Sequence, residues 1–392
     1  MSARQARRET VRHQPSFILE TPDVRLAMTE RGGHMAPVEF LRGGSRPFEP
    51  YYVAPWAGEP DLAAPSIIQV LRGDFFCCPF GGNAEPFAGE RHPVHGETAN
   101  ETWTLRESGG ENGAWMRLDL ELRIRPGRVE KFVALADGQN VVYQTDAISG
   151  MDGPMNFGHH ATLLFPDEEG AGRLSFSPLR KARVYVKPTE NTAERGYSIL
   201  KPGAAIDSLS KVERSDGRIA DLTRYPARRG FEDIAILCAA EGLEFGWSAA
   251  AIESQGAVWF SLRDPRILPS TLLWHSNGGR HYPPWSGRNI NTLGIEDILG
   301  YFHEGLAASA RENDLSAAGI PTSRIMRAGE TLRVRYIQGA AAIPPGFGAV
   351  RAIERAGSDA IRLAGEFGHT VEAPCRLDYL WDGQAPGVDA KG

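Results

Sequence analysis

Alternation of apolar and polar residues is the feature that most constrains the fold of this chain. Within residues 115–124, WMRLDLELRI, every second residue from Met116 to Ile124 is apolar and its neighbours are polar. A period of two places the apolar side chains on one face of a β-strand. Turn formers follow at 125–128, and residues 129–149 read as two more strands around a central turn. The pattern predicts an antiparallel meander.

Strand-like segments recur along most of the chain, punctuated by Gly, Pro, Asn and Asp. They occupy residues 16–30, 173–187, 231–250, 257–264, 270–278 and 330–341. Helical periodicity is scarce, and short helices are predicted only within 296–314 and 346–366. No repeat of fixed period indicates a propeller or a solenoid. We therefore predict an all-β fold, a large antiparallel β-sandwich with a few short helices.

The domain organisation is predicted to be simple. Residues 1–20 are expected to form a flexible N-terminal segment, and residues 21–392 a single β-sandwich domain. Residues 188–230 are polar and rich in turn formers, which predicts a long insertion over the sandwich surface. Such an insertion lines a binding site in some proteins and is only decorative in others.

Composition excludes several classes of protein. With 42% hydrophobic and 23% charged residues the chain is typical of a stable globule. The net charge is −6 and no basic face is visible, so nucleic acid is not an expected partner. No apolar run reaches the roughly 18 residues of a membrane-spanning helix, and the N-terminus lacks a signal peptide. We expect a cytoplasmic monomer or homodimer without a membrane partner.

Three polar stretches, far apart in the chain, are candidates for acid–base chemistry. They are His95-Gly96, the pair His159-His160, and Glu296. Each lies among apolar or β-favouring residues, which indicates attachment to a rigid strand or tight loop. A carboxylate in the apolar run at Glu296 is costly unless it is hydrogen-bonded or functional, and burial raises its pKa toward that of a general base. Asp297 is the alternative acid, and two structural histidines are the alternative at 159–160.

A loop at residues 274–289 is rich in aromatic residues. It carries Trp274, His281, Tyr282 and Trp285 among Gly and Pro. Aromatic faces suit the C–H faces of a sugar ring, although a packed structural loop has a similar composition. His92 and His95 are spaced three apart, but no third metal ligand lies nearby in the sequence, so neither a metal nor another cofactor is expected.

Taken together, these motifs resemble the aldose 1-epimerase (galactose mutarotase-like) superfamily, including its glucose-6-phosphate 1-epimerase-like branch. The residues that carry the resemblance are Leu71-Arg72-Gly73-Asp74, Cys77-Cys78-Pro79-Phe80-Gly81, His95-Gly96, Trp103, His160 and Glu296. The resemblance spans about residues 20–340. It implies a β-supersandwich that interconverts the α and β anomers of a sugar without a metal.

The resemblance also implies roles for individual residues. Glu296 is the base and His160 the acid, while Arg72 and His95 orient sugar hydroxyls; His159, Trp274, His281 and Trp285 are further expected sugar-binding residues. Ala99 stands where the phosphate-sugar branch has an arginine, which favours a free monosaccharide or a sugar acid as the partner. A non-catalytic carbohydrate-binding protein, or a polysaccharide lyase or hydrolase on the same sandwich, are the alternatives.

Overall fold

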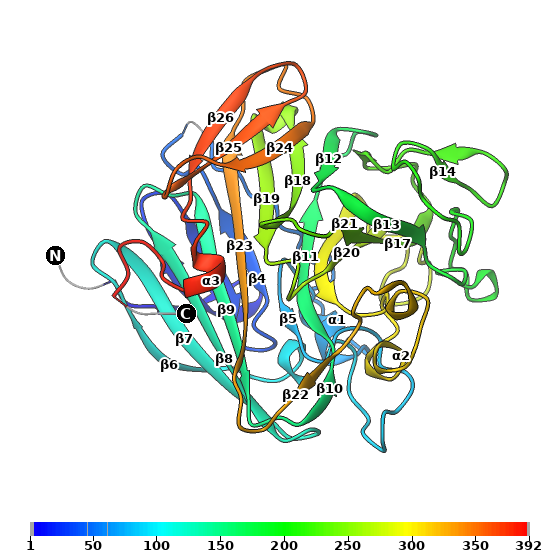
Figure 1. Ribbon diagram of the computed structural model, residues 1–392, viewed down its shortest axis with the longest axis horizontal. Helices are drawn as coiled ribbons and strands as arrows, with labels where there is room; N and C mark the ends of the chain where they lie inside the picture. Colours follow the sequence, from blue (N-terminus) through cyan, green and yellow to red (C-terminus); the bar gives the residue numbers. More distant parts are fainter. Residues whose placement is uncertain (1–3, 45, 61, 390–392) are drawn as a thin grey trace.

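A six-stranded sheet forms one layer of the molecule. The computed structural model describes residues 4–44, 46–60 and 62–389. Neighbouring strands of this sheet run antiparallel. Their order is β13 (Leu179–Val184), β17 (Phe231–Ala239), β20 (Ser270–Asn277), β21 (Thr292–Leu299), β11 (Phe157–Leu164) and β5 (Phe76–Cys77). These strands lie in the right half of Figure 1.

A nine-stranded antiparallel sheet forms the second layer. Its order is β16 (Arg224–Tyr225), β12 (Gly172–Phe176), β18 (Gly246–Ile252), β19 (Ala257–Arg263), β23 (Leu332–Ala342), β9 (Val141–Ser149), β8 (Gly127–Ala136), β7 (Gly113–Leu122) and β6 (Thr104–Gly109). The alternating segment 115–124 lies mostly in β7, whose Met116 and Leu118 are buried as the period of two predicts. The predicted antiparallel β-sandwich is confirmed.

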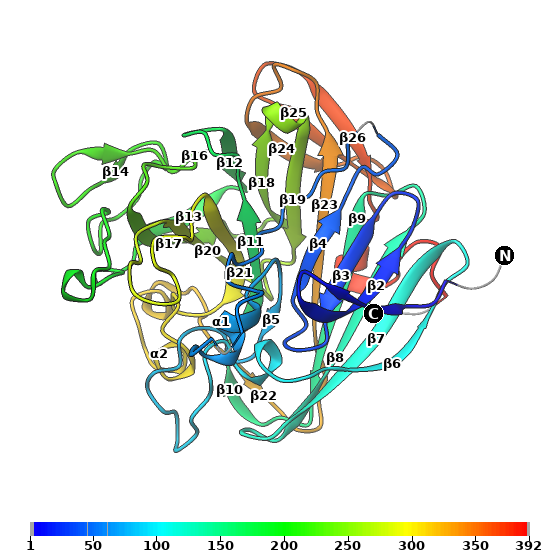
Figure 2. The same cartoon turned by 180° about the vertical axis from the view of Figure 1, so that it is seen from behind.

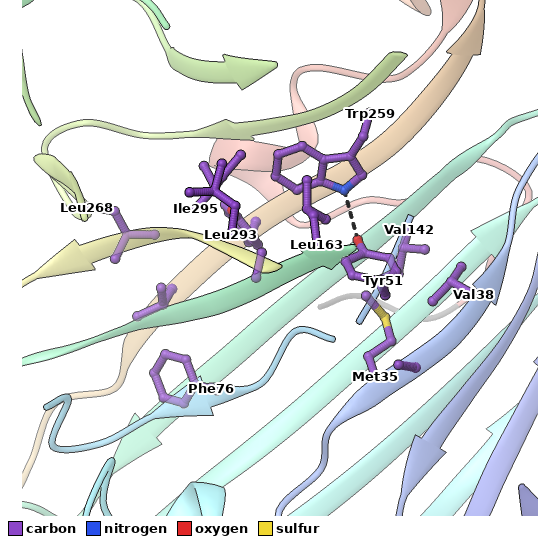
Figure 3. Close-up of a cluster of buried hydrophobic side chains, with 14 of the residues drawn as sticks. Met35, Val38, Tyr51, Phe76, Val142, Leu163, Trp259, Leu268, Leu293 and Ile295 are labelled. Carbon is purple, nitrogen blue, oxygen red and sulfur yellow. Dashed lines mark hydrogen bonds between the residues drawn. The ribbon is translucent and has the colours of Figure 1, made fainter. Parts of the chain in front are cut away.

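Two sheets share the inner face of the nine-stranded sheet. The six-stranded sheet covers one part, and a four-stranded sheet covers the part around β7 (Figure 2). The smaller sheet has the order β1 (Arg7–Val11), β2 (Gln14–Glu20), β3 (Arg25–Thr29) and β4 (Met35–Glu39). Figure 3 shows part of the resulting core, in which Trp259 Nε1 donates a hydrogen bond of 3.1 Å to the hydroxyl of Tyr51.

Further apolar layers cover the outer faces of both large sheets. The antiparallel strands β24 (Val350–Arg355), β25 (Ala360–Gly365) and β26 (Thr370–Pro374), with helix α3 (Tyr379–Asp382), pack on the nine-stranded sheet. On the six-stranded sheet, loops and the short helix α1 (Ser66–Val70) form another core. The short helix α2 (Leu306–Ala310) packs its Leu306 into the main core instead. Every residue of β21 is buried because both of its faces are covered.

Short elements complete the described chain. They are β10 (Gly153–Met155), β22 (Arg324–Met326), β14 (Val212–Glu213), β15 (Ile219–Ala220) and the 3₁₀ turns η1 (Glu97–Ala99), η2 (Thr192–Glu194), η3 (Glu253–Gln255) and η4 (Ser316–Ala318). None of the helices in the described ranges has the length and apolarity needed to cross a bilayer.

Three local predictions need correction. The segment 1–20 was predicted as flexible, but residues 7–20 form the β-hairpin β1–β2, whose Phe17 is fully buried. Residues 1–3 lie outside the described residues. The helix predicted within 346–366 is the hairpin β24–β25. The insertion 188–230 is anchored to the main core by buried Leu200, Val212 and Tyr225, so it does more than cover the surface. The single domain at 21–392 stays a prediction.

Candidate active site

A pocket of about 170 Å³ lies on the outer face of the six-stranded sheet. Strands β11, β17, β20 and β21 supply its floor, and α1 with the loops around residues 94, 285 and 303 supply its walls. Its polar and aromatic lining residues are His95, His160, Trp274, Arg280, Trp285, Glu296 and His303. The structure therefore brings together residues from all three polar stretches and from the aromatic loop.

His160 and Glu296 form the centre of this pocket. They are cross-strand partners in the antiparallel pair β11–β21, so their side chains leave the sheet on the same face. His160 Nε2 lies 3.3 Å from Glu296 Oε1. The other ring nitrogen, Nδ1, lies 3.0 Å from Thr162 Oγ1, which orients the imidazole. Both side chains are buried.

Burial sets the protonation of this pair. It raises the pKa of Glu296 well above its usual value and lowers the pKa of His160 to about 4. It also lowers the pKa of His95 well below the ordinary range. Burial thus favours the protonated carboxyl group of Glu296 and the neutral imidazole rings of His160 and His95. The His160–Glu296 pair then holds one proton that either partner is able to carry.

Two glycines make room for this arrangement. A Cβ atom at Gly294 would lie 2.4 Å from Glu296 Oε1, so the carboxyl group occupies space that only glycine leaves free. A Cβ atom at Gly96 would lie 2.1 Å from the carbonyl oxygen of Cys78. Gly96 therefore allows two backbone segments to approach each other closely. This backbone contact holds the His95 ring edge-on to the His160 ring, with ring centroids 4.8 Å apart.

Aromatic side chains and one arginine form the opposite wall. Trp274 and Trp285 stand edge to face, with centroids 5.9 Å apart. The guanidinium of Arg280 lies 4.6 Å from the Trp285 ring, and its Nε donates to Glu190 Oε1 over 2.7 Å. Glu190 belongs to the insertion 188–230, so that segment helps to fix this wall. Tyr282 also donates to Glu190, from outside the pocket lining.

Three of the expected sugar-binding residues, Arg72, His159 and His281, do not line this pocket. Arg72 is fully buried, and its guanidinium donates to the carbonyl oxygens of Val70, Val11 and Arg12, which ties the N-terminal hairpin to the body. His159 points to the opposite face of the sheet, where its Nδ1 lies 3.0 Å from Asp74. His281 is exposed and lies outside the pocket lining.

Two of the polar lining residues, Arg280 and His303, were not among the residues predicted from the sequence. Arg280 lies in the aromatic loop, where the Gly and Pro residues leave no periodic pattern to indicate which polar side chain turns inward. His303 lies in a segment that was predicted as helical and is a loop before α2. Burial lowers the pKa of His303 to about 4, so it is a third neutral imidazole facing the pocket.

No group of three His, Cys, Asp or Glu side chains within residues 4–44, 46–60 and 62–389 is arranged to hold a metal ion. His92, the other member of the His92–His95 pair, lies 2.9 Å from the carboxylate of Glu90. Glu90 in turn accepts hydrogen bonds from Arg125. The arrangement around His92 is thus a structural ion-pair network beside the pocket.

Comparison with known proteins identifies the fold. No known family model and no curated protein matches the sequence. Solved structures do match. A candidate aldose 1-epimerase from Klebsiella pneumoniae superposes with a TM-score of 0.60 at 13% identity, over 86% of this chain and 83% of that one. The fold is that of the galactose mutarotase-like proteins. The family resemblance seen in the sequence is thus confirmed for the fold.

Two further structures of the same kind match this fold. A candidate aldose 1-epimerase from Escherichia coli K12 gives a TM-score of 0.57 at 12% identity and covers 84% of this chain and 99% of that one. A galactose mutarotase-like protein from Lactobacillus casei gives 0.54 at 12% identity, over 83% and 100%. At such identities the likeness concerns the fold, and the chemistry has to be argued from this chain's own pocket.

Proposed function

We propose that this protein is a carbohydrate isomerase that interconverts the α and β anomers of a free monosaccharide. The observation that carries the proposal is the His160–Glu296 pair, with 3.3 Å between Nε2 and Oε1, at the floor of an aromatic-walled pocket. An acid and a base side by side suit a hemiacetal, whose anomeric oxygen and ring oxygen are bonded to the same carbon. The indole rings supply faces for the C–H groups of the sugar.

In the proposed mechanism Glu296 and His160 exchange protons with these two oxygens. The Glu296 carboxylate removes the proton of the anomeric hydroxyl, and the His160 imidazolium protonates the ring oxygen as the bond from C1 to that oxygen breaks. The open-chain aldehyde rotates about the bond from C1 to C2. The ring then closes on the other face of C1, with both proton transfers reversed. This ionised pair holds the same number of protons as the neutral pair that burial favours, so no proton has to enter from solvent.

Hydrolysis is the less suitable chemistry for this pocket. Glycosidases use two carboxyl groups, about 5–5.5 Å apart in retaining and about 6.5–9.5 Å apart in inverting enzymes. Among the described residues that line the pocket, Glu296 is the one carboxyl group. Glu232 lies behind Trp274 and accepts hydrogen bonds from Trp274 Nε1 and Gly279 N over 3.2 Å and 3.0 Å. A second acid is therefore not presented to a bound sugar.

The electrostatics favour an uncharged substrate. Arg72, which was expected to contact the sugar, has no guanidinium free for an anion, because its donors are used by backbone carbonyl oxygens. Arg280 is the one guanidinium in the described lining, and Glu190 already neutralises it. The neutral histidines add no positive charge. A carboxylate or phosphate on the sugar would thus be desolvated without a free cation.

Exchange NMR on Glu296→Gln tests the proposal. Glutamine keeps the shape and hydrogen bonds of the site but removes its basicity, so sugar binding should persist while anomer exchange falls by ~10²-fold or more. Glu111→Gln, at an exposed carboxyl, is the matched control. A panel of free aldoses is compared with the corresponding uronic acids and 6-phosphates. Binding without exchange in the wild type would instead show a non-catalytic carbohydrate-binding protein.

A further inference from the structure

A second, larger pocket of about 450 Å³ lies on the other face of the six-stranded sheet. It forms where the ends of β17 and β20 meet the insertion 188–230 and the edge strand β16. Figure 1 shows β14, part of the same insertion, at the outer edge of the molecule beyond β13 and β17. The volume lies within the range of ligand-binding pockets, roughly 300–1,000 Å³.

Asp233 and His275 form the floor of this second pocket. They are cross-strand partners in the pair β17–β20. Ile234 follows Asp233 and Trp274 precedes His275, and both line the candidate active site instead. The reason is that neighbouring side chains of a strand leave the sheet on opposite faces. The two pockets are therefore separated by the sheet itself. They share no lining residue.

His275 carries hydrogen-bonding capacity that the described protein does not use. Its side chain is 5% exposed, and neither Nδ1 nor Nε2 has a hydrogen-bond partner. A buried polar group without a partner costs free energy, which a bound molecule would recover. Asp233 is held in place beside it, because its carboxyl group accepts hydrogen bonds of 3.1 Å from Ile199 N and 2.9 Å from Leu200 N.

The walls and rim of the pocket indicate what kind of molecule fits. The walls include Leu200, Leu222, Tyr225 and Phe231, which are apolar or aromatic. The lining holds three basic and three acidic residues: Arg214, Arg224 and Arg228, and Glu169, Asp221 and Asp233. Arg214 is further paired with Asp216, and Arg224 with Asp221. The lining therefore does not select strongly for a charged ligand.

We propose that this pocket is a second binding site, for an uncharged, hydroxyl-bearing molecule of one or two sugar rings in size. Its hydroxyl groups bond to His275 and Asp233, and its C–H faces pack on the apolar walls. Burial supports this chemistry. It lowers the pKa of His275 to about 4, so the neutral ring offers one donor and one acceptor, as a hydroxyl group requires. The inference does not rest on the proposed isomerisation.

The test is a ligand titration that monitors the ring signals of His275 by ¹H–¹⁵N NMR. The signals are assigned by their loss in His275→Gln. The uncharged probes are methyl β-glucopyranoside, methyl β-galactopyranoside, myo-inositol and trehalose; inorganic phosphate and benzoate are the charged probes. Methyl glycosides are locked anomers, so they report binding without any exchange of anomers. We expect at least one uncharged probe to shift the His275 signals.

Two variants locate the binding. Ala227 lines the pocket and is exposed, so Ala227→Trp should fill the mouth and weaken binding at least ~10-fold. Ala193→Trp, exposed on the same insertion outside the pocket, should leave binding unchanged, as should Glu296→Gln in the other pocket. Absence of any shift from the uncharged probes overturns the proposal. So does a response to the charged probes alone, or binding that survives in Ala227→Trp.

Discussion

His160 on β11 and Glu296 on β21 face each other across an antiparallel strand pair, with 3.3 Å between Nε2 and Oε1. Their neighbours His159 and Asp297 are paired in the same register and point to the opposite face. There Asp297 accepts hydrogen bonds from Ser261, Thr271 and Tyr336. A well-bonded polar network between the two large sheets thus fixes the register that positions the candidate acid and base.

Glu296→Gln should raise the melting temperature at high pH. The folded-state pKa of Glu296 is raised above the unfolded value near 4.5, so its stabilising contribution is present below that pH and is lost as the pH rises. Glutamine does not ionise, so the variant avoids the free-energy cost of a buried carboxylate at high pH. We expect a gain of about 2–5 °C at pH 8 that closes toward pH 4.5, measured by differential scanning calorimetry. A gain that does not change with pH would contradict burial of an ionisable carboxyl group.

Gly294→Ala should impair the site without unfolding the protein. The added Cβ would lie 2.4 Å from Glu296 Oε1 and 3.1 Å from Trp274 Cβ, so the carboxyl group must move. We expect anomer exchange to fall by about 10-fold or more, because a displacement near 1 Å misaligns proton transfer. Gly329→Ala, where nothing lies within 4 Å of the added atom, is the control. Equal exchange rates in both variants would show that the carboxyl position does not matter.

Arg72→Met should affect stability and not sugar binding. The variant loses donors to the carbonyl oxygens of Val70, Val11 and Arg12 in a fully buried place. We expect a loss of about 3 kcal/mol in the free energy of unfolding, measured by urea denaturation. The sugar Kd should stay within about twofold, since Arg72 does not line the pocket. A tenfold weaker Kd with unchanged stability would return Arg72 to the binding site.

Arg280→Lys should weaken sugar binding although the charge is kept. The guanidinium lies 4.6 Å from the Trp285 ring and 5.4 Å from the Trp274 ring, and an ammonium group does not reproduce this planar contact. We expect KM to rise about 10-fold, with a smaller change in kcat. Arg288→Lys is the matched control, because Arg288 lies over Trp56 outside the pocket. Similar effects in both variants would place the cause outside the pocket.

The helix predicted within 346–366 shows how local propensity fails. Alanine, glutamate and arginine in this segment favour a helix when considered alone. In the structure Ile353, Ile361 and Leu363 of the hairpin β24–β25 are buried in the core on the nine-stranded sheet. Packing against a distant part of the chain decides between helix and strand here, and no local pattern records it.

The sequence by itself determined the β-sandwich class, because a period of two requires strands with one buried face. Its motifs also supplied His95, His160, Glu296, Trp274 and Trp285, which the structure places in one pocket.

Only the tertiary structure decided which neighbouring side chain faces the pocket. His159 and His160 are chemically identical, yet one lies between the sheets and the other in the pocket. Arg72, which the resemblance predicts to orient sugar hydroxyls, donates hydrogen bonds to backbone carbonyl oxygens instead. The physical reason is that neighbouring side chains of a strand point to opposite faces of the sheet, and the layers packed on each face determine which face carries the pocket.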